Sequence, residues 1–215
     1  MTWPTVLDEF ETVSKVLEGF SLARFGDGEL KMIYGAGYSR EHGNPAIAAE
    51  LYDVLGEPHE RCLPAIPTLD EQGPKYRNWL RHQQRFEDVL DLSRVYGSAF
   101  VSRPDSSPWI DNVEYAELVS SIWASKRAAV VCERKGSMFS AVRMRAKQTT
   151  HIECPRIGAY RVIDDLERAV MDLRPDVAVL SAGPTATCLA NRLSARFVHA
   201  VDLGSAGGFL RRLLS

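Results

Sequence analysis

Two short apolar runs, AAVVC at residues 128–132 and VAVLS at residues 177–181, constrain the fold of this 215-residue chain more than any other feature. Neither run alternates apolar and polar residues, as a strand with one face in water would. A strand that is apolar at nearly every position suits a parallel sheet whose two faces are both covered by helices. We therefore expect an α/β protein with a buried parallel sheet.

Similar β-rich runs recur along the chain, and helical patterns separate them. The expected strands cover residues 20–25, 61–66, 95–101, 127–132, 149–154, 176–181 and 196–202. The expected helices cover residues 5–18, 27–35, 45–56, 74–92, 112–124, 137–147, 160–173, 184–194 and 205–214. This alternation predicts a single three-layer Rossmann-like domain over residues 1–215, with a mostly parallel sheet of about seven strands. Ligands of such domains bind at the carboxyl ends of the strands.

The composition indicates where the protein is expected to be located and which partners its charge would attract. Hydrophobic residues make up 45% of the chain and charged residues 25%, and the formal net charge is −2. No apolar run approaches the roughly 20 residues of a membrane span, and the acidic start MTWPTVLDEF has no signal-peptide pattern. We expect a cytoplasmic protein without a membrane span, and the net charge provides no general attraction for nucleic acid.

The stretch RFGDGE, residues 24–29, ends the first expected strand and begins a helix. Its carboxylates, Asp27 and Glu29, are one residue apart, and hard cations such as Mg²⁺ and Mn²⁺ prefer oxygen ligands. Gly26 and Gly28 let the backbone turn tightly and approach a ligand. The same carboxylates can instead cap the helix and favour its dipole. On these residues alone, both interpretations stay open.

A second strand-turn-helix pattern, LSAGPTATCLANRL, covers residues 180–193. The amide groups of Gly183, Thr185 and Ala186, with the hydroxyls of Thr185 and Thr187, can receive a phosphate at such a turn. The alternative is a Gly-Pro turn before a Thr-capped helix. Carboxylates for a metal and amides for a phosphate, both at strand ends of one sheet, together predict a site for a nucleoside diphosphate.

Three more places at strand ends carry polar residues that suit such a site. Arg103 follows the third strand and can hold a phosphate or a sugar, and Trp109 beyond it can stack on a sugar ring. The charged residues 133–135 directly follow AAVVC, and Asp202 ends the last strand, where it suits ribose binding or general-base catalysis. The alternatives are a surface arginine, a packed tryptophan, a solvated turn and a helix cap.

Five segments in a fixed order resemble the GT-D type glycosyltransferases, a family first described as a bacterial domain of unknown function. They are SLARFGDGEL at 21–30, AFVSRP at 99–104, ECPRIGAYRVIDDL at 153–166, and VLSAGPTATCLANRL with AVDLG within 179–204. The resemblance implies a Rossmann-like enzyme that transfers a sugar from a nucleotide-sugar, with a UDP-sugar as the expected donor. It also implies Mn²⁺ or Mg²⁺ held by Asp27 and Glu29.

The chain departs from the family pattern at two places. Gly158, Ala159 and Tyr160 stand where the family often has an asparagine before Ala-Phe, and Ser205 stands where a histidine commonly follows Asp-x-Gly. Both changes leave the donor sugar, the acceptor and the nucleotide base open.

The resemblance also suggests roles for the other strand-end residues. Arg103 is expected on the donor or the acceptor side. The expected diphosphate contacts are Arg24, Gly26, Gly183, Pro184, Thr185, Ala186 and Thr187. If the reaction inverts the configuration, a carboxylate must deprotonate the acceptor hydroxyl, and Asp202, Asp105 and Glu133 are the candidates. The alternative function is a nucleotide or sugar-phosphate binding protein, or a phosphohydrolase, that uses the same metal and phosphate turn.

Residues 126–147 form a basic stretch in which Glu133 is the one acidic residue. Its basic residues are Lys126, Arg127, Arg134, Lys135, Arg143, Arg145 and Lys147. The stretch is either an ordinary solvated surface or an edge that holds a polyanionic acceptor, such as modified DNA or a phosphate-bearing glycan. The acceptor is expected to bind to loops of this one domain or to a partner in a homo-oligomer.

Overall fold

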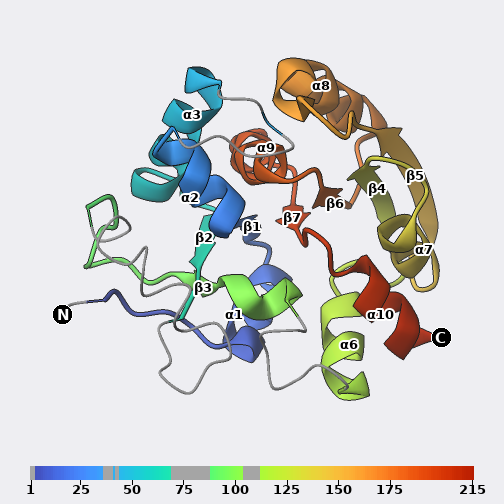
Figure 1. Ribbon diagram of the computed structural model, residues 1–215. Coiled ribbons are helices and arrows are strands. Elements are labelled where there is room, and N and C mark those ends of the chain that lie inside the picture. Colours follow the sequence, from blue (N-terminus) through green and yellow to red (C-terminus); the bar gives the residue numbers. More distant parts are fainter. Residues whose placement is uncertain (1–2, 36–40, 42–43, 69–87, 104–111) are drawn as a thin grey trace.

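The computed structural model describes residues 3–35, 41, 44–68, 88–103 and 112–215, and there it shows one parallel sheet of seven strands (Figure 1). The strands are β1 (Ser21–Arg24), β2 (Cys62–Ile66), β3 (Gly97–Ser98), β4 (Arg127–Cys132), β5 (Gln148–Glu153), β6 (Val177–Ser181) and β7 (Ala200–Asp202). They are ordered β3-β2-β1-β7-β6-β4-β5 across the sheet. The predicted parallel α/β fold is confirmed.

The two apolar runs that led to this prediction lie side by side as β4 and β6. Ala128 is opposite Val177 and Val131 is opposite Leu180 in a parallel register. Both strands are buried along almost their whole length. Hydrophobic side chains on both faces of these strands therefore hold this part of the sheet to the two helix layers, at about 25 cal/mol for each Å² of apolar surface removed from water.

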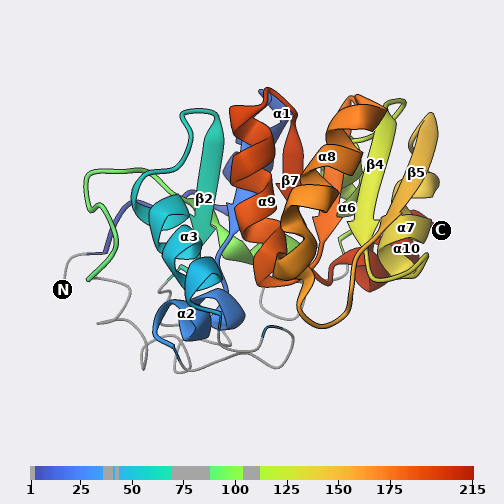
Figure 2. The ribbon, with the colours of Figure 1, turned by 90° about the horizontal axis from the view of Figure 1, so that it is seen from above.

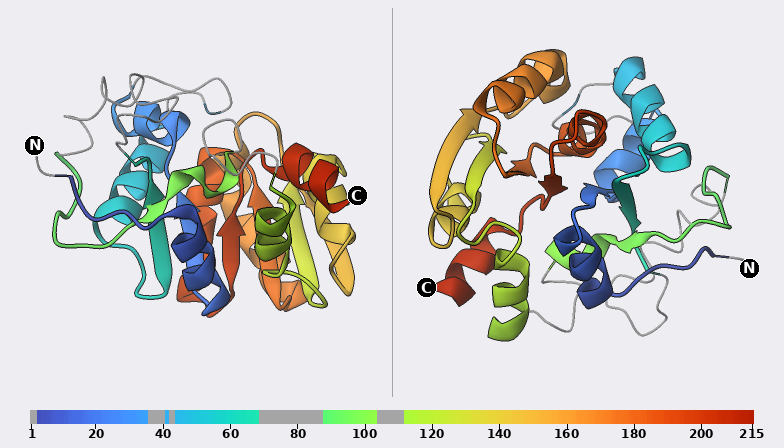
Figure 3. Two further views of the ribbon diagram at one scale, coloured as in Figure 1. Left: turned by 90° about the horizontal axis from the view of Figure 1, so that it is seen from below. Right: turned by 180° about the vertical axis from the view of Figure 1, so that it is seen from behind.

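Helices cover both faces of the sheet, which gives the three predicted layers (Figure 3). One face carries α1 (Glu9–Leu17), α6 (Val113–Ser120), α7 (Ser137–Arg143) and α10 (Gly207–Leu214). The other face carries α2 (Asp27–Ile33), α3 (Pro45–Gly56), α8 (Ile163–Leu173) and α9 (Pro184–Ala195). No helix within the described ranges is long and apolar enough to cross a membrane.

Several predicted elements are shorter in the structure. The last strand, predicted over 196–202, is only Ala200–Asp202, and the helix predicted over 112–124 ends at Ser120. The third strand is only two residues long, because the chain turns into a 3₁₀ helix, η1 (Ala99–Ser102), whose first turn is capped by the Ser98 hydroxyl accepting from the Phe100 N–H at 3.2 Å. Helix α7 ends at Arg143 instead of residue 147. Of the helix predicted over 74–92, residues 88–92 form turns and coil, and 74–87 lie outside the described residues.

The sheet topology brings the carboxyl ends of all strands to one edge, and Figure 2 shows the helices that follow them. Helix α2 follows β1, α7 follows β4, α9 follows β6 and α10 follows β7. The first residues of these four helices therefore lie near the same edge, where such folds bind ligands.

Candidate functional site

A cleft of about 600 Å³ opens at the carboxyl edge of the sheet. Residues at or after the ends of several strands line it. They are Arg24, Gly26, Asp27, Gly28 and Glu29 after β1, Arg103 after η1, Cys132, Glu133, Arg134, Gly136, Ser137 and Met138 after β4, Ser181 and Gly183 after β6, and Gly204, Ser205 and Gly207 after β7. Both carboxylates of RFGDGE and the glycine of the 183–187 turn thus face the same cavity.

Asp27 and Glu29 occupy the first turn of α2 in different environments. Glu29 is 4% exposed, and its Oε2 accepts a hydrogen bond from the Gly26 N–H at 2.7 Å, which caps the helix. Asp27 is about half exposed and forms an ion pair with Lys31 at 2.5 Å, one helical turn further on. The capping contact of Glu29 is therefore present, and because a carboxylate has about four lone-pair sites it is compatible with a ligand in the cleft as well.

The donor set around these two carboxylates decides which kind of metal could bind. No group of three or more His, Cys, Asp or Glu side chains suited to a metal comes together within the described part of the chain. Mg²⁺ is usually held by one or two carboxylates together with substrate phosphates and water. The residues therefore fit Mg²⁺ or Mn²⁺ accompanied by a diphosphate, and they do not provide a site made of protein ligands alone.

The Arg24 side chain lies between two glycines, Gly26 and Gly204, and reaches the cleft there. A Cβ atom on Gly204 would lie 2.6 Å from Arg24 Nη2, and one on Gly26 would lie 3.3 Å from Nη1. Gly204 also has a φ of +49°, which favours glycine. The Nε atom of Arg24 is buried and has no hydrogen-bond partner among the described residues. A guanidinium with an unused N–H beside a cleft suits an anionic ligand.

The turn before α9 contributes Gly183 to the cleft. Gly183 has φ +62° and ψ −146°, a conformation essentially restricted to glycine, and Pro184 begins the helix directly after it. Pro184 and Ala186 are buried and are not among the residues that line the cleft. A phosphate in the cleft would therefore meet this turn at Gly183.

The two threonine hydroxyls predicted to contact phosphate lie beneath the cleft. Both side chains are fully buried. The Thr185 hydroxyl donates to Glu41 Oε1 at 2.8 Å, and the Thr187 hydroxyl donates to the Arg24 carbonyl at 3.0 Å. The structure thus places them in contacts that hold the turn and the end of β1 together.

Asp202 ends β7 and is 1% exposed, and it does not line the cleft. Its Oδ1 accepts from the Gly204 N–H at 2.9 Å, and its Oδ2 lies 3.3 Å from the Thr187 hydroxyl oxygen, within hydrogen-bond distance. Burial raises the pKa of Asp202 to about 7, against the opposing effect of the nearby Arg24 cation. Asp202 therefore supports the glycine against which Arg24 packs.

The remaining candidates are divided between the cleft and the undescribed part of the chain. Glu133 lines the cleft and is partly buried. Arg103 lines the cleft as well. Ser205, where the family pattern has a histidine, is exposed and faces the same cavity. Asp105 and Trp109 lie outside the described residues.

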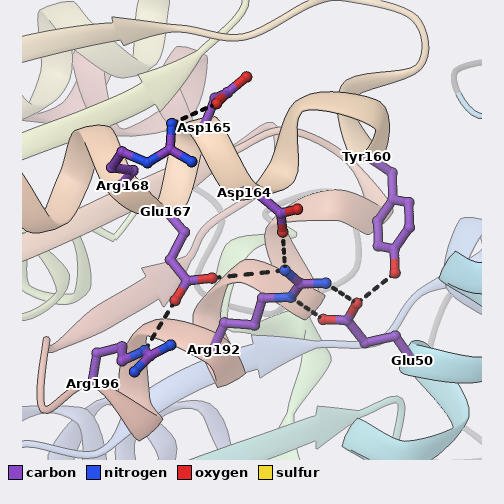
Figure 4. A network of polar contacts seen from close by, with 8 residues as sticks. All are labelled: Glu50, Tyr160, Asp164, Asp165, Glu167, Arg168, Arg192 and Arg196. Carbon is purple, nitrogen blue, oxygen red and sulfur yellow. Dashed lines mark hydrogen bonds and ion pairs between the residues drawn. The ribbon is translucent and has the colours of Figure 1, made fainter.

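A buried polar cluster next to the 183–187 turn was not predicted from the sequence. Glu41, 3% exposed, accepts from the Tyr160 N–H at 3.1 Å as well as from Thr185. The Tyr160 hydroxyl donates to Glu50 Oε2 at 2.5 Å, and Glu50 also pairs with Arg192 (Figure 4). These partners are more than 100 residues apart in sequence, so no local pattern could reveal them.

The basic stretch 126–147 separates into two groups. Arg134 lines the cleft at the carboxyl end of β4, whereas Arg127 is opposite Gln148 at the amino ends of β4 and β5. A strand of this length places its two ends roughly 16 Å apart, at about 3.3 Å per residue. Arg127 and Arg145 are paired with Asp176 and Glu117. The basic residues of this stretch therefore do not all lie at one edge of the sheet.

Comparison with known proteins points to one family. The family model described as "Glycosyltransferase GT-D fold" matches residues 22–207. The "Probable glycosyl transferase Gly" of Streptococcus gordonii is 30% identical over 219 residues, covering 93% of this chain and 32% of that protein. "Glycosyltransferase GlyD" of Streptococcus pneumoniae serotype 4 is 25% identical over 209 residues, covering 90% of this chain and 26% of that protein. The chain thus spans about a third or less of the length of these relatives.

Solved structures share the fold. One, described as a highly conserved domain of unknown function 1792 with a distinct glycosyltransferase fold, superimposes with a TM-score of 0.84 at 22% identity, covering 94% of this chain and 78% of that chain. Another, described as a new glycosyltransferase from Streptococcus sanguinis, has a TM-score of 0.83 at 23% identity and covers 94% of this chain and 81% of that chain. At these identities the likeness concerns the fold.

Proposed function

Because the chain belongs to the glycosyltransferase GT-D fold family, we propose that it transfers a sugar from a nucleotide-sugar, with a UDP-sugar as the expected donor, to an acceptor hydroxyl. The observation that carries this proposal is the cleft, in which Arg24, Gly183 and the carboxylates Asp27 and Glu29 face one cavity. A cation, a glycine turn and a pair of carboxylates suit a diphosphate that brings a metal with it.

On the donor side, each residue has a distinct part. Asp27 and Glu29 would hold Mn²⁺ or Mg²⁺, which neutralises charge that develops on the departing diphosphate. Arg24 would donate to phosphate oxygens from its position between Gly26 and Gly204. Gly183, with no side chain in the way, would let the phosphates approach the start of α9.

The charge of the cleft favours a neutral acceptor. Its described lining contains three arginines, Arg24, Arg103 and Arg134, and three carboxylates, Asp27, Glu29 and Glu133. A divalent cation and the diphosphate of the donor roughly cancel each other, so little positive charge is left for a polyanion. We therefore propose a sugar or other neutral hydroxyl as the acceptor, with a polyanion such as modified DNA as the alternative.

A donor panel tests the proposal. The protein is incubated with UDP-glucose, UDP-galactose or UDP-N-acetylglucosamine, with and without glycoside and serine-containing peptide acceptors, and released UDP is measured. We expect release that depends on an acceptor, stops in EDTA and is lost in Asp27→Asn, because a neutral amide binds hard cations poorly. Equal release without any acceptor would instead indicate a phosphohydrolase, and donor binding without release would indicate a binding protein.

A further inference from the structure

The three carboxylates that line the cleft differ in what already engages them. Asp27 pairs with Lys31, and Glu29 accepts from the Gly26 N–H. Glu133 has no hydrogen bond or ion pair through its side chain to any residue that the structure describes. It is therefore the cleft carboxylate that is available to accept a proton from a bound molecule.

The sheet order places Glu133 to one side of the residues proposed to hold the diphosphate. These residues follow β1, β7 and β6, which are adjacent, and Glu133 follows β4, the next strand in the sheet. The ends of β1 and β4 are three strand spacings apart, which is about 14 Å. A donor whose diphosphate lies at the ends of β1, β7 and β6 can thus extend its sugar towards β4, so that the acceptor meets the cleft at Glu133.

Asp202, the other candidate base among the described residues, is buried and already engaged. Asp202 is 1% exposed, lies outside the cleft lining, and has both oxygens engaged by Gly204 and Thr187. A general base must come within hydrogen-bond reach of the proton that it removes. Asp202 would have to leave both contacts to do so, whereas Glu133 already faces the cavity.

We propose that Glu133 is the general base of a single displacement, an inference that rests on the transferase function proposed above. The acceptor oxygen forms a bond to the anomeric carbon, and the bond from that carbon to the diphosphate oxygen breaks, with its electron pair leaving on the nucleoside diphosphate. The acceptor proton passes to the Glu133 carboxylate. Attack from the side opposite the leaving group inverts the configuration of the anomeric carbon.

The test compares Glu133→Gln with Glu153→Gln as a matched control. Glu153 ends the neighbouring strand β5, directly opposite Cys132, and is exposed outside the cleft. With the UDP-sugar and acceptor that give the most UDP release, we expect Glu133→Gln to lower kcat by roughly 100-fold or more, in line with general-base contributions. UDP binding in the presence of Mn²⁺, measured by the shift in thermal unfolding temperature, should be unchanged in both variants.

Sodium azide separates a base from a structural residue, because azide attacks carbon without losing a proton. Added to Glu133→Gln and donor, azide should restore UDP release and give a glycosyl azide of inverted configuration, with no such gain in Glu153→Gln. Normal turnover in Glu133→Gln, absence of azide rescue, or a product with retained configuration would each overturn the inference. If the unaltered protein releases no UDP with any donor and acceptor, the proposed transferase function itself fails.

Discussion

At the scale of single residues, the contact between Arg24 and Gly204 makes the sharpest prediction. In Gly204→Ala, the new Cβ would lie 2.6 Å from Arg24 Nη2, so the guanidinium must move away from its place at the cleft. We expect the donor KM to rise by about 10-fold, the equivalent of roughly 1.4 kcal/mol, with a smaller change in kcat. UDP binding, measured by calorimetry in Mn²⁺, should weaken in parallel.

The control for this variant is Gly35→Ala. Gly35 has a positive φ of +70°, and no atom lies within 4 Å of a Cβ placed there. It therefore carries the strain of an alanine in the left-handed region, which costs about 1 kcal/mol, without disturbing Arg24. Equal losses of UDP affinity in the two variants would show that backbone strain, rather than the position of the guanidinium, explains the effect.

The raised pKa of Asp202 leads to a prediction of how the free energy of unfolding depends on pH. Burial raises its pKa in the folded protein to about 7, from an ordinary value of 3.8. Between these values the folded state holds a proton that the unfolded state has lost, so this group makes the protein less stable as pH rises from about 4 to 7. Asp202→Asn should remove a slope of up to about 1.4 kcal/mol per pH unit.

The measurement is the free energy of unfolding in urea, without metal, at several pH values from about 4.5 to 8. The difference between Asp202→Asn and the unaltered protein should change with pH below about 7 and become constant above it. Two curves that run parallel over the whole range would show that Asp202 does not carry the proton.

Gly183 and Thr185 show which features of the site could be predicted from the sequence and which could not. The small-residue turn predicted that the backbone approaches a ligand, and Gly183 does line the cleft in a conformation that suits glycine. The same pattern predicted phosphate contacts for Thr185, whose hydroxyl instead meets Glu41. A motif indicates which residues are near a turn, but the direction of a side chain depends on partners elsewhere in the chain.

At the scale of elements, the close packing of α10 on α7 depends on one glycine. A Cβ atom on Gly207 would lie 2.3 Å from the backbone nitrogen of Met138. Because that neighbour is backbone, it cannot move without shifting a helix, and we expect Gly207→Ala to lower the free energy of unfolding by about 1–3 kcal/mol. Urea or thermal unfolding measures the loss.

The neighbouring residue provides the comparison. Gly208 lies on the same helix, and no atom is within 4 Å of a Cβ placed there. Gly208→Ala should therefore leave stability unchanged or raise it by up to about 1 kcal/mol, because alanine favours helices more than glycine does. If both variants behaved alike, helix propensity rather than packing would explain the result at Gly207.

The strands were predictable where burial alone specifies them. β4 is apolar after Arg127 and β6 is apolar up to Ser181, and their predicted ranges differ from the structure by at most one residue. β3 could not be predicted as well, because a hydroxyl cap at Ser98 turns an apolar sequence into a 3₁₀ helix. Local hydrogen bonds of this kind compete with the sheet and leave little trace in the hydrophobic pattern.

At the scale of the whole molecule, sheet geometry separates residues that are close in sequence. Arg134 and Arg143 are nine positions apart, but the chain crosses from the carboxyl edge to the amino edge of the sheet along α7. A count of charges along the sequence cannot register this crossing. For the acceptor proposed above, the cleft-lining Arg134 is therefore a better candidate contact than the basic residues at the other edge.

The salt dependence of acceptor binding distinguishes the possible acceptors. A neutral acceptor predicts a KM that stays flat between about 50 and 200 mM salt, whereas each phosphate contact on duplex DNA contributes a slope of about −0.9 in log affinity against log salt. We expect the flat result, together with an indifferent Arg143→Glu/Lys147→Glu double variant, because neither residue lines the cleft: Arg143 ends α7, and Lys147 directly precedes the amino end of β5. An anionic acceptor held at the cleft would give a different result. Its KM would depend on salt, would rise in Arg134→Glu and would stay unchanged in the double variant. Sensitivity to both changes would require a polyanion long enough to span the roughly 16 Å between the two ends of β4, as a nucleic acid can.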